Sequence, residues 1–342
     1  MMFRKSSFLA LLLATSFVVI GQRPTEIHNL VFEGAGIRGI AYCGALKEME
    51  SRGLISGIKR VAGTSAGALM AMAISLGYSA DELKEIISNT NFKEFNDGKY
   101  FFIGGINRLD RYFGWYRSNR LDKWIGQLIE SKTGDPNITF SDMHRKNFKD
   151  LYVTGTCLNK QKLIVFSKET YPQMRIRDAV RISMSIPLYF EAVFMDTNGR
   201  VINHPHEKRN LDIMLDGGFT ANFPIRVFDS TRYQSSSGPN LFEYNMQTVG
   251  FRIDRTDQIK NDTTKKQLAE MQVKNLKGYV AAFYNIIIES LNRQSLTDDD
   301  WVRTISISDG GIGPRLRRLS DEEVQSLLRN GKLSMINHLL QP

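Results

Sequence analysis

The sequence predicts an α/β fold in which a mainly parallel sheet is covered by helices on both faces. A short apolar run at residues 30–32 leads into a glycine-rich turn, and residues 40–49 then show the apolar spacing of a helix. The same order repeats where residues 58–62 lead into Gly63 and a helix of small residues that begins at Ser65. Two adjacent strand–turn–helix units imply parallel strands, because the intervening helix carries the chain back across the sheet.

Further apolar segments complete this fold. At 342 residues, 42% hydrophobic and 24% charged, the chain can bury one large core or two modest ones. No internal repeat or flexible linker divides it, so we expect a single domain with a cap-like insertion. Additional strands are expected at residues 151–156, 163–166, 213–215, 248–253 and 302–307, a hairpin at Asn198-Gly199, and one long helix over 262–291.

The N-terminus has the order of a secretory signal peptide. Arg4 and Lys5 precede an apolar run over residues 8–20, which is too short to span a bilayer comfortably, and Gly21 follows. We therefore expect residues 1–21 to be a signal and the protein to be exported, as a periplasmic, secreted or membrane-associated protein. An uncleaved anchor is the alternative, and the protein would be cytoplasmic if the segment is no signal.

Charge and cysteine content exclude several classes of function. The net charge is +9 and the isoelectric point is near 9.4, yet the basic residues are dispersed and no nucleic-acid-binding motif appears, so no nucleic-acid partner is expected. The positive charge suits attraction to an anionic lipid surface or solubility alone. Cys43 and Cys157 are the two cysteines, and they provide neither a disulfide framework nor metal-ligand spacing.

Residues 91–130 differ in composition from their surroundings, because aromatic residues alternate with arginines. Such a composition is typical of a cap at a membrane interface, but aromatic side chains also dominate ordinary cores. Both interpretations, a membrane-facing cap and a cover for the sheet, remain open. The residues concerned are Phe92, Phe95, Tyr100, Phe101, Phe102, Tyr112, Phe113, Trp115, Tyr116 and Trp124, with Arg108, Arg111, Arg117 and Arg120.

The pentapeptide Gly63-Thr64-Ser65-Ala66-Gly67 has the Gly-x-Ser-x-Gly pattern of a nucleophile elbow. A tight turn between strand and helix lifts the serine hydroxyl above the sheet, and the glycines allow close approach of backbone and substrate. The N-terminus of the helix also favours developing negative charge. By itself the pattern is weak, since a serine at this place can simply cap its helix. Its position directly after an apolar strand favours the nucleophile.

A second glycine-rich segment, Gly34-Ala35-Gly36-Ile37-Arg38-Gly39, matches Gly-x-Gly-x-x-Gly. A dinucleotide-binding fold would place an acidic residue at the end of the next strand to hold the ribose, and here that strand ends in Val61-Ala62 instead. The segment then offers backbone amides near Ser65 that can stabilise a tetrahedral oxyanion. Arg38 can support the loop, meet a lipid phosphate or point into solvent.

A serine nucleophile needs a base, and the histidines are poorly placed for that role. His338 alone follows Asp216 in the order Ser, Asp, His, close to the C-terminus. Asp216-Gly217-Gly218 comes directly after the apolar run 213–215, which puts a carboxylate at the end of a strand. This is where a direct Ser–Asp dyad would place its base, although an aspartate that opens a turn has the same pattern.

Taken together, these three segments resemble the motifs of patatin-like phospholipases, in the order found in that family. Residues 178–187 and Phe190 also resemble the segment that joins nucleophile and base, and the similarity covers about residues 29–224. The resemblance implies a three-layer α/β/α sandwich with a catalytic core over 27–225, on which residues 226–342 pack. One departure is Ala35, where many members carry a third consecutive glycine; the loop tolerates it if Ala35 can adopt the required dihedral angles.

The resemblance further implies a lipid acyl hydrolase of the phospholipase A or lysophospholipase type, with Ser65 and Asp216 as a dyad. The oxyanion would be held by amides around Gly34, Ala35 and Gly36, and no cofactor or metal is implied. The expected partner is a lipid or phospholipid substrate at a membrane surface. The alternatives are a lipid-binding protein without turnover and an esterase or acyltransferase assisted by His338.

Overall fold

The computed structural model describes residues 26–98, 101–232, 241–264, 267–313 and 317–340. Within them lies a nine-stranded sheet. Eight of its strands follow the order β13-β12-β1-β2-β4-β9-β7-β8, and the ninth, β5, pairs with β4. The predicted signal segment, residues 1–21, lies outside the described residues. The strands of this sheet are β1 (Asn29–Phe32), β2 (Arg60–Gly63), β4 (Asp150–Cys157), β5 (Lys162–Phe166), β7 (Val193–Met195), β8 (Val201–Ile202), β9 (Asp212–Asp216), β12 (Thr248–Asp254) and β13 (Thr304–Ser308).

The sheet is mainly parallel, as the sequence predicts. β13, β12, β1, β2 and β4 run parallel to one another, whereas β5 and β9 pair antiparallel with β4. The predicted hairpin is confirmed, since β7 and β8 pair antiparallel around Gly199, which has φ of 81°. Because β12 and β13 lie beside β1, the C-terminal part of the chain contributes strands to the same sheet as the N-terminal part.

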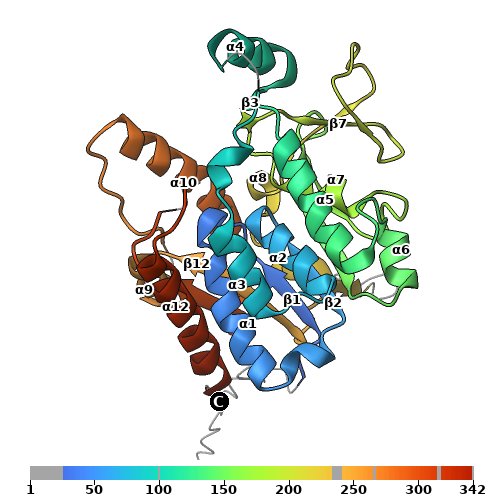
Figure 1. The fold of residues 1–342 in the computed structure, drawn as a ribbon. Helices are drawn as coiled ribbons and strands as arrows, with labels where there is room; N and C mark the ends of the chain where they lie inside the picture. Colours follow the sequence, from blue (N-terminus) through green and yellow to red (C-terminus); the bar gives the residue numbers. More distant parts are fainter. Residues whose placement is uncertain (1–25, 99–100, 233–240, 265–266, 314–316, 341–342) are drawn as a thin grey trace, which may run out of the picture.

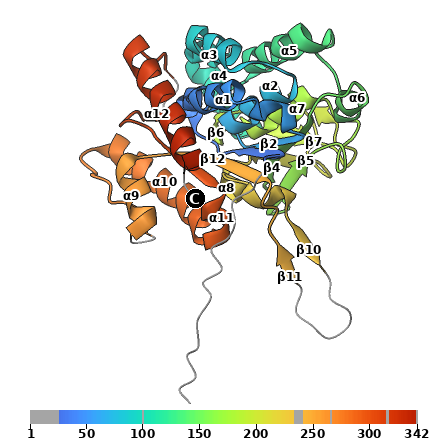
Figure 2. The ribbon, with the colours of Figure 1, turned by 90° about the horizontal axis from the view of Figure 1, so that it is seen from below.

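Helices cover both faces of the sheet and give the fold its three layers (Figures 1 and 2). One face carries α1 (Ala41–Ser51), α2 (Ala66–Ser75), α3 (Ala80–Asn89), α5 (Asn119–Thr133), α7 (Ile176–Ser183) and α12 (Asp321–Leu340). The other face carries α8 (Gly218–Ala221), α9 (Thr256–Thr264), α10 (Leu276–Gln294) and α11 (Asp298–Val302). The molecule is therefore an α/β/α sandwich.

The remaining elements lie around this sandwich. They are α4 (Phe101–Tyr112), which projects at the top of Figure 1, α6 (Phe140–Arg145), the short ladder of β3 (Gly114–Tyr116) with β6 (Leu188–Phe190), the ladder of β10 (Ser230–Arg232) with β11 (Leu241–Glu243), and the 3-10 turns Gly36–Ile40, Leu54–Gly57, Phe92–Phe95 and Ile225–Phe228.

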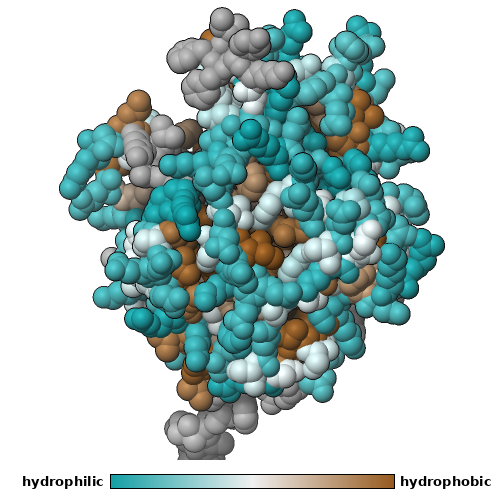
Figure 3. Space-filling view, viewed as in Figure 1, coloured by the Kyte–Doolittle hydropathy of each residue, from teal (hydrophilic) through white to brown (hydrophobic). Residues whose placement is uncertain are grey.

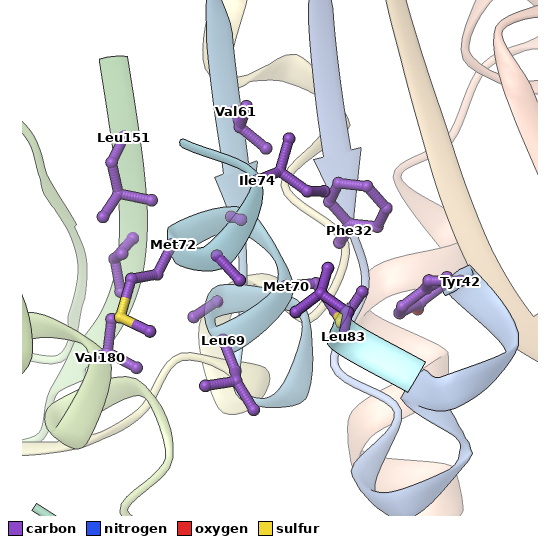
Figure 4. Close-up of a cluster of buried hydrophobic side chains, with 14 of the residues drawn as sticks. Phe32, Tyr42, Val61, Leu69, Met70, Met72, Ile74, Leu83, Leu151 and Val180 are labelled. Atoms are coloured by element: carbon purple, nitrogen blue, oxygen red, sulfur yellow. The ribbon is translucent and has the colours of Figure 1, made fainter. Parts of the chain in front are cut away.

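The main core lies between the sheet and the helices that carry the site. Phe32 of β1 stacks on Phe251 of β12 with ring centroids 5.0 Å apart, and Tyr42 of α1 meets Phe32 edge-on. Figure 4 shows α2 at the centre of this cluster, where Met70 and other α2 side chains contact residues from several elements. Since α2 is buried almost throughout, the turn that precedes it is held rigidly.

The prediction of one long helix over residues 262–291 is wrong. The structure has two helices, α9 and α10, and the described residues between them, 267–275, are not helical. Gln258 in α9 stabilises that segment, because its amide group donates to the Gln267 carbonyl and accepts from the Ala269 amide. Asn275 then begins a new helix by accepting from the Gly278 amide. Side-chain hydrogen bonds to the backbone here outweigh helix propensity.

Many side chains of the aromatic and basic segment cover the sheet. Phe92, Phe95 and Trp124 form a cluster with ring centroids 5.2–6.1 Å apart. Arg108 is buried and donates from Nε to the Trp115 carbonyl, so it holds the cap together. Tyr100 and the side chains of Phe101 and Phe102 lie outside the described part of the chain. Phe92 and Phe95 are thus part of the buried core, and Trp124 packs against it.

Candidate active site

Ser65 lies in the turn between β2 and α2, in a backbone conformation that is rare for a serine. Its φ is 54° and its ψ is −122°, a region normally adopted by glycine. The Ser65 side chain makes no capping hydrogen bond to α2, so the interpretation of this serine as a helix cap is wrong. Its amide donates to Oγ of Ser183 at 2.8 Å, which fixes the turn from the side of α7.

The two glycines of the pentapeptide allow α2 to approach both β2 and β1 closely. A Cβ on Gly63 would lie 2.1 Å from the Gly67 carbonyl oxygen, and a Cβ on Gly67 would lie 2.3 Å from the carbonyl oxygen of Phe32. Both contacts are with backbone and cannot be relieved by a rotamer change. The tight turn that exposes the Ser65 hydroxyl thus depends on both glycines.

Asp216 is the last residue of β9, and its side chain lies close enough to Ser65 for that serine to lower the pKa of the carboxyl group. Asp216 Oδ1 also accepts from the Gly218 amide at 2.8 Å. Gly217 makes this position possible, since a Cβ there would lie 2.4 Å from Oγ1 of Thr154. The structure therefore brings together the two residues that the sequence analysis assigns as nucleophile and base.

The Asp216 carboxyl group is buried, and burial is the main influence on its pKa. Desolvation raises the pKa from 3.8 to about 6, while the hydrogen bond from the Gly218 amide and the neighbouring Ser65 side chain oppose the rise. A carboxylate with a pKa near 6 is still mainly ionised at pH 7 and is a better proton acceptor than an exposed aspartate.

The glycine-rich loop lies beside Ser65, but one of its amides is already occupied. The Gly34 amide donates to the Asn222 carbonyl at 3.1 Å, so in this structure that amide is engaged, and its role at the oxyanion stays a prediction. Among the described residues, the amides of Ala35 and Gly36 have no acceptor. Ala35 has φ of −133°, which alanine adopts readily, whereas Gly36 has φ of 57°. The alanine in place of a third glycine is therefore compatible with the loop.

Arg38 supports the loop from outside the cavity. Its Nε donates to the Ala35 carbonyl at 3.1 Å, and its guanidinium pairs with Asp309 at 3.4 Å. Because a trans peptide points its carbonyl and its amide in opposite directions, binding the Ala35 carbonyl turns the Gly36 amide away from Arg38. Gly36 lines the same cavity as Ser65. Of the three roles considered for Arg38, support of the loop matches these contacts.

A narrow apolar slot leads to Ser65. Its free volume is about 50 Å³, and its wall is built by the glycine-rich loop, α2, the cap and the segment before β6. A slot with such an apolar lining suits an acyl chain better than a polar group. The lining residues are Gly36, Ile37, Gly39, Ile40, Ser65, Ala66, Leu69, Met70, Ile87, Phe92, Phe95, Leu121, Met184, Ile186 and Phe190.

Sequence reasoning missed three residues that position the site. The side-chain Nδ2 of Asn222 donates to the Gly34 carbonyl at 3.1 Å. The backbone amide of Asn222 donates to Oδ1 of Asn292 at 2.7 Å. Ser183, noted above, holds the Ser65 amide. Asn222 lies four residues after Gly218 of the Asp-Gly-Gly motif. This closeness in sequence is a weak signal that Asn222 belongs to the site. Asn292 is 70 residues further along the chain, and nothing in the sequence links it to the motif.

His338 lies in α12 and lines a different cavity, together with Thr304, Ser306 and Trp301. It is absent from the wall of the Ser65 slot, so the structure gives no support to a histidine base. No group of three or more His, Cys, Asp or Glu side chains among the described residues is arranged to hold a metal ion. No helix in that part of the chain is long and apolar enough to cross a membrane.

Fold and site together define an α/β protein with a nucleophile elbow and a carboxylate partner. A family model described as patatin-like phospholipase matches residues 30–229, more than half of the chain. The chain belongs to the patatin-like phospholipase family, as the resemblance of its three motifs indicates.

Two viral proteins are among the relatives of the chain. The chain is 33% identical over 206 residues to the uncharacterized protein R571 of Acanthamoeba polyphaga mimivirus, covering 60% of this chain and 62% of that protein. It is 27% identical over 206 residues to the probable lipid hydrolase 463L of invertebrate iridescent virus 6, covering 60% and 64%. The chain thus matches somewhat less than two thirds of each relative.

Among solved structures, VipD from Legionella pneumophila has a similar fold. The TM-score is 0.54 at 15% sequence identity, with 93% of this chain and 67% of that chain covered. At this level of identity the similarity concerns the fold alone.

Proposed function

We propose that this protein is a serine lipid acyl hydrolase that cleaves fatty-acyl esters of phospholipids or lysophospholipids through Ser65 and Asp216. The observation that carries the proposal is the Ser65 hydroxyl. It lies on a strained turn, does not cap its helix, and lies beside a buried carboxylate whose pKa is raised to about 6. The apolar slot at Ser65 supports an acyl chain as the bound part of the substrate.

The proposed reaction has two steps. Ser65 Oγ attacks the ester carbonyl carbon while its proton passes to the Asp216 carboxylate. The amides of Ala35 and Gly36 stabilise the negative charge on the carbonyl oxygen. The tetrahedral intermediate then expels the alcohol, which takes its proton from Asp216, and leaves an acyl group on Ser65. Water repeats the sequence, with Asp216 again accepting the proton, and releases the fatty acid.

Position-labelled phospholipids and lysophospholipids test this proposal, because the released acyl chain identifies both the activity and the ester position. We expect Ser65→Ala and Asp216→Asn to abolish release, and a fluorophosphonate probe to label the native chain but not Ser65→Ala. Matched controls are Ser56→Ala, at an exposed serine, and Asp212→Asn, at the other end of β9. Turnover by either dyad variant would exclude the mechanism.

We also propose that the protein is exported, on the basis of the basic, apolar and small-residue order of residues 1–21. Expression of the full chain in a bacterial host should yield a product shortened by about this segment outside the cytoplasm. The intact mass of the product measures this directly. A full-length product confined to the cytoplasm would contradict export.

A further inference from the structure

Helix α10 consists of two parts with different surroundings. Its C-terminal part is fixed to the site. The side-chain oxygen of Asn292 accepts a hydrogen bond from the backbone amide of Asn222, and Ile288 is buried next to Gly218. Glu289 lies between them and pairs with Arg252 and Arg293, each at 3.0 Å. Asn222 in turn holds the Gly34 carbonyl beside Ser65. This end of α10 is thus part of the framework of the dyad.

The N-terminal part of α10 exposes a stripe of large apolar side chains. The four members, spaced by three, four and three residues, are between 57% and 78% exposed. At 100° per residue this spacing places them within an arc of about 80°, on the side of the helix opposite Ile288 and Asn292. They are Leu276, Tyr279, Phe283 and Ile286.

Such a stripe is unusual on the surface of a water-soluble domain. Single exposed apolar residues are common, but a continuous apolar face on a projecting helix indicates an interaction site. Val273, in the segment that precedes the helix, is 49% exposed and adds to the same end. Figure 3 shows apolar atoms at this projecting end of α10, at the upper left.

The charge of this segment indicates the kind of surface it meets. Residues 271–288 contain Lys274 and Lys277 and no aspartate or glutamate. The first acidic residue along the helix is Glu289, where α10 enters the protein and the charge is paired with arginines. A segment that combines exposed aliphatic and aromatic residues with lysines, and has no acidic residue between Glu270 and Glu289, is complementary to a layer of anionic lipid head groups.

The position of the stripe relative to the site agrees with this partner. In Figure 1 the outer end of α10 and the helix α4 project at the same end of the molecule. Ile106 of α4 is 57% exposed, and Leu188 of β6 is 67% exposed. The segment that contains Leu188 also contributes Ile186 and Phe190 to the wall of the Ser65 slot.

We propose that the stripe of α10 is an interfacial anchor, which lies among the head groups of an anionic bilayer and brings the Ser65 slot to the lipid. The biological purpose of this anchor rests on the proposed hydrolase function, but the binding itself does not require turnover. The fixed C-terminal part of the helix then sets the distance between the bilayer and the dyad.

The test uses the full chain and vesicles of phosphatidylcholine with or without phosphatidylglycerol. Vesicle binding is measured by co-sedimentation in a Ser65→Ala background, so that no lipid is consumed. We expect binding to the anionic vesicles to fall about tenfold or more when Tyr279 and Phe283 are both changed to serine, because the aromatic area that enters the bilayer is removed. Leu333→Ser, at a half-exposed leucine of α12, is the matched control and should bind normally.

Two further measurements separate this inference from the proposed function. With Ser65 intact, the double variant should hydrolyse a soluble short-chain ester normally but lose vesicle-lipid hydrolysis in proportion to its loss of binding. Unchanged vesicle binding by the double variant would overturn the anchor. So would light scattering that shows the native chain to be a dimer, if only the double variant disrupts that dimer. Absence of all ester hydrolysis, with vesicle binding intact, would instead overturn the proposed hydrolase.

Discussion

Replacing Asp216 by asparagine should make the protein more stable at neutral pH while it removes activity. The substitution keeps the shape of the side chain; its oxygen can still accept from the Gly218 amide, and its NH₂ group can donate to Ser65. What disappears is a buried negative charge. Since burial disfavours the charged form, the native carboxylate is a source of instability that catalysis requires.

The size of this effect follows from the raised pKa of Asp216. The pKa is about 6 in the folded protein, against an ordinary value of 3.8, and each pH unit corresponds to 1.36 kcal/mol. Between these two values the folded state holds a proton that the unfolded state has lost, so native stability falls as the pH rises. We expect Asp216→Asn to gain about 3 kcal/mol at pH 8, about half of that at pH 5, and almost nothing below pH 4.

Urea unfolding of both proteins, followed by tryptophan fluorescence at several pH values, measures this difference. Asp212→Asn is the control, because Asp212 lies on the same strand but pairs with Lys160 at 2.7 Å; it should gain no stability at pH 8. A gain for Asp216→Asn that did not change with pH, or a loss of stability at pH 8, would refute the assignment of Asp216 as a buried, destabilised carboxylate.

Four other predictions follow from the same geometry. The kcat/KM for a soluble ester should rise with pH and reach half its maximum near pH 6, since Asp216 must be ionised to accept the proton; a profile without that step would exclude Asp216 as the base. Gly34→Ala should strongly reduce folding yield and probe labelling, because its Cβ would lie 2.4 Å from the Asn222 side chain, whereas Gly39→Ala, with 3.5 Å to its nearest neighbour, should keep a near-native folding yield. Ser65→Gly should raise the free energy of unfolding by about 1–3 kcal/mol in the same urea titration, as the strain of a serine at φ 54° is relieved. His338→Ala should keep full ester hydrolysis, because His338 lines a different cavity from Ser65, and a large loss of kcat would revive a histidine-assisted mechanism.

Local sequence order was sufficient to predict much of the fold. Strands β1, β2, β4, β5, β9, β12 and β13 all lie where short apolar runs are bounded by turn residues. The hairpin at Gly199 was readable because the turn and its two strands are contiguous. The helix over 262–291 was misjudged, since the break between α9 and α10 depends on the reach of the Gln258 side chain across nine residues to Gln267.

The site was predictable as a set of motifs and less so as an arrangement of atoms. Ser65, Asp216 and their glycines could be found because each motif is a strand end followed by a turn of small residues. That the Gly34 amide is occupied by Asn222, and that Asn292 fixes Asn222 in turn, could not be found in the same way. These contacts join residues up to 188 positions apart.

The sequence by itself determined the α/β class, the elbow at Ser65 and the candidate base, because strands, turns and close approaches of glycine are encoded by neighbouring residues. Only the tertiary structure decided which amides remain available for an oxyanion, how far the pKa of Asp216 rises, and that the apolar face of α10 stays exposed. Each of these depends on what surrounds a group in space, since desolvation and hydrogen-bond partners come from segments that are distant in the chain.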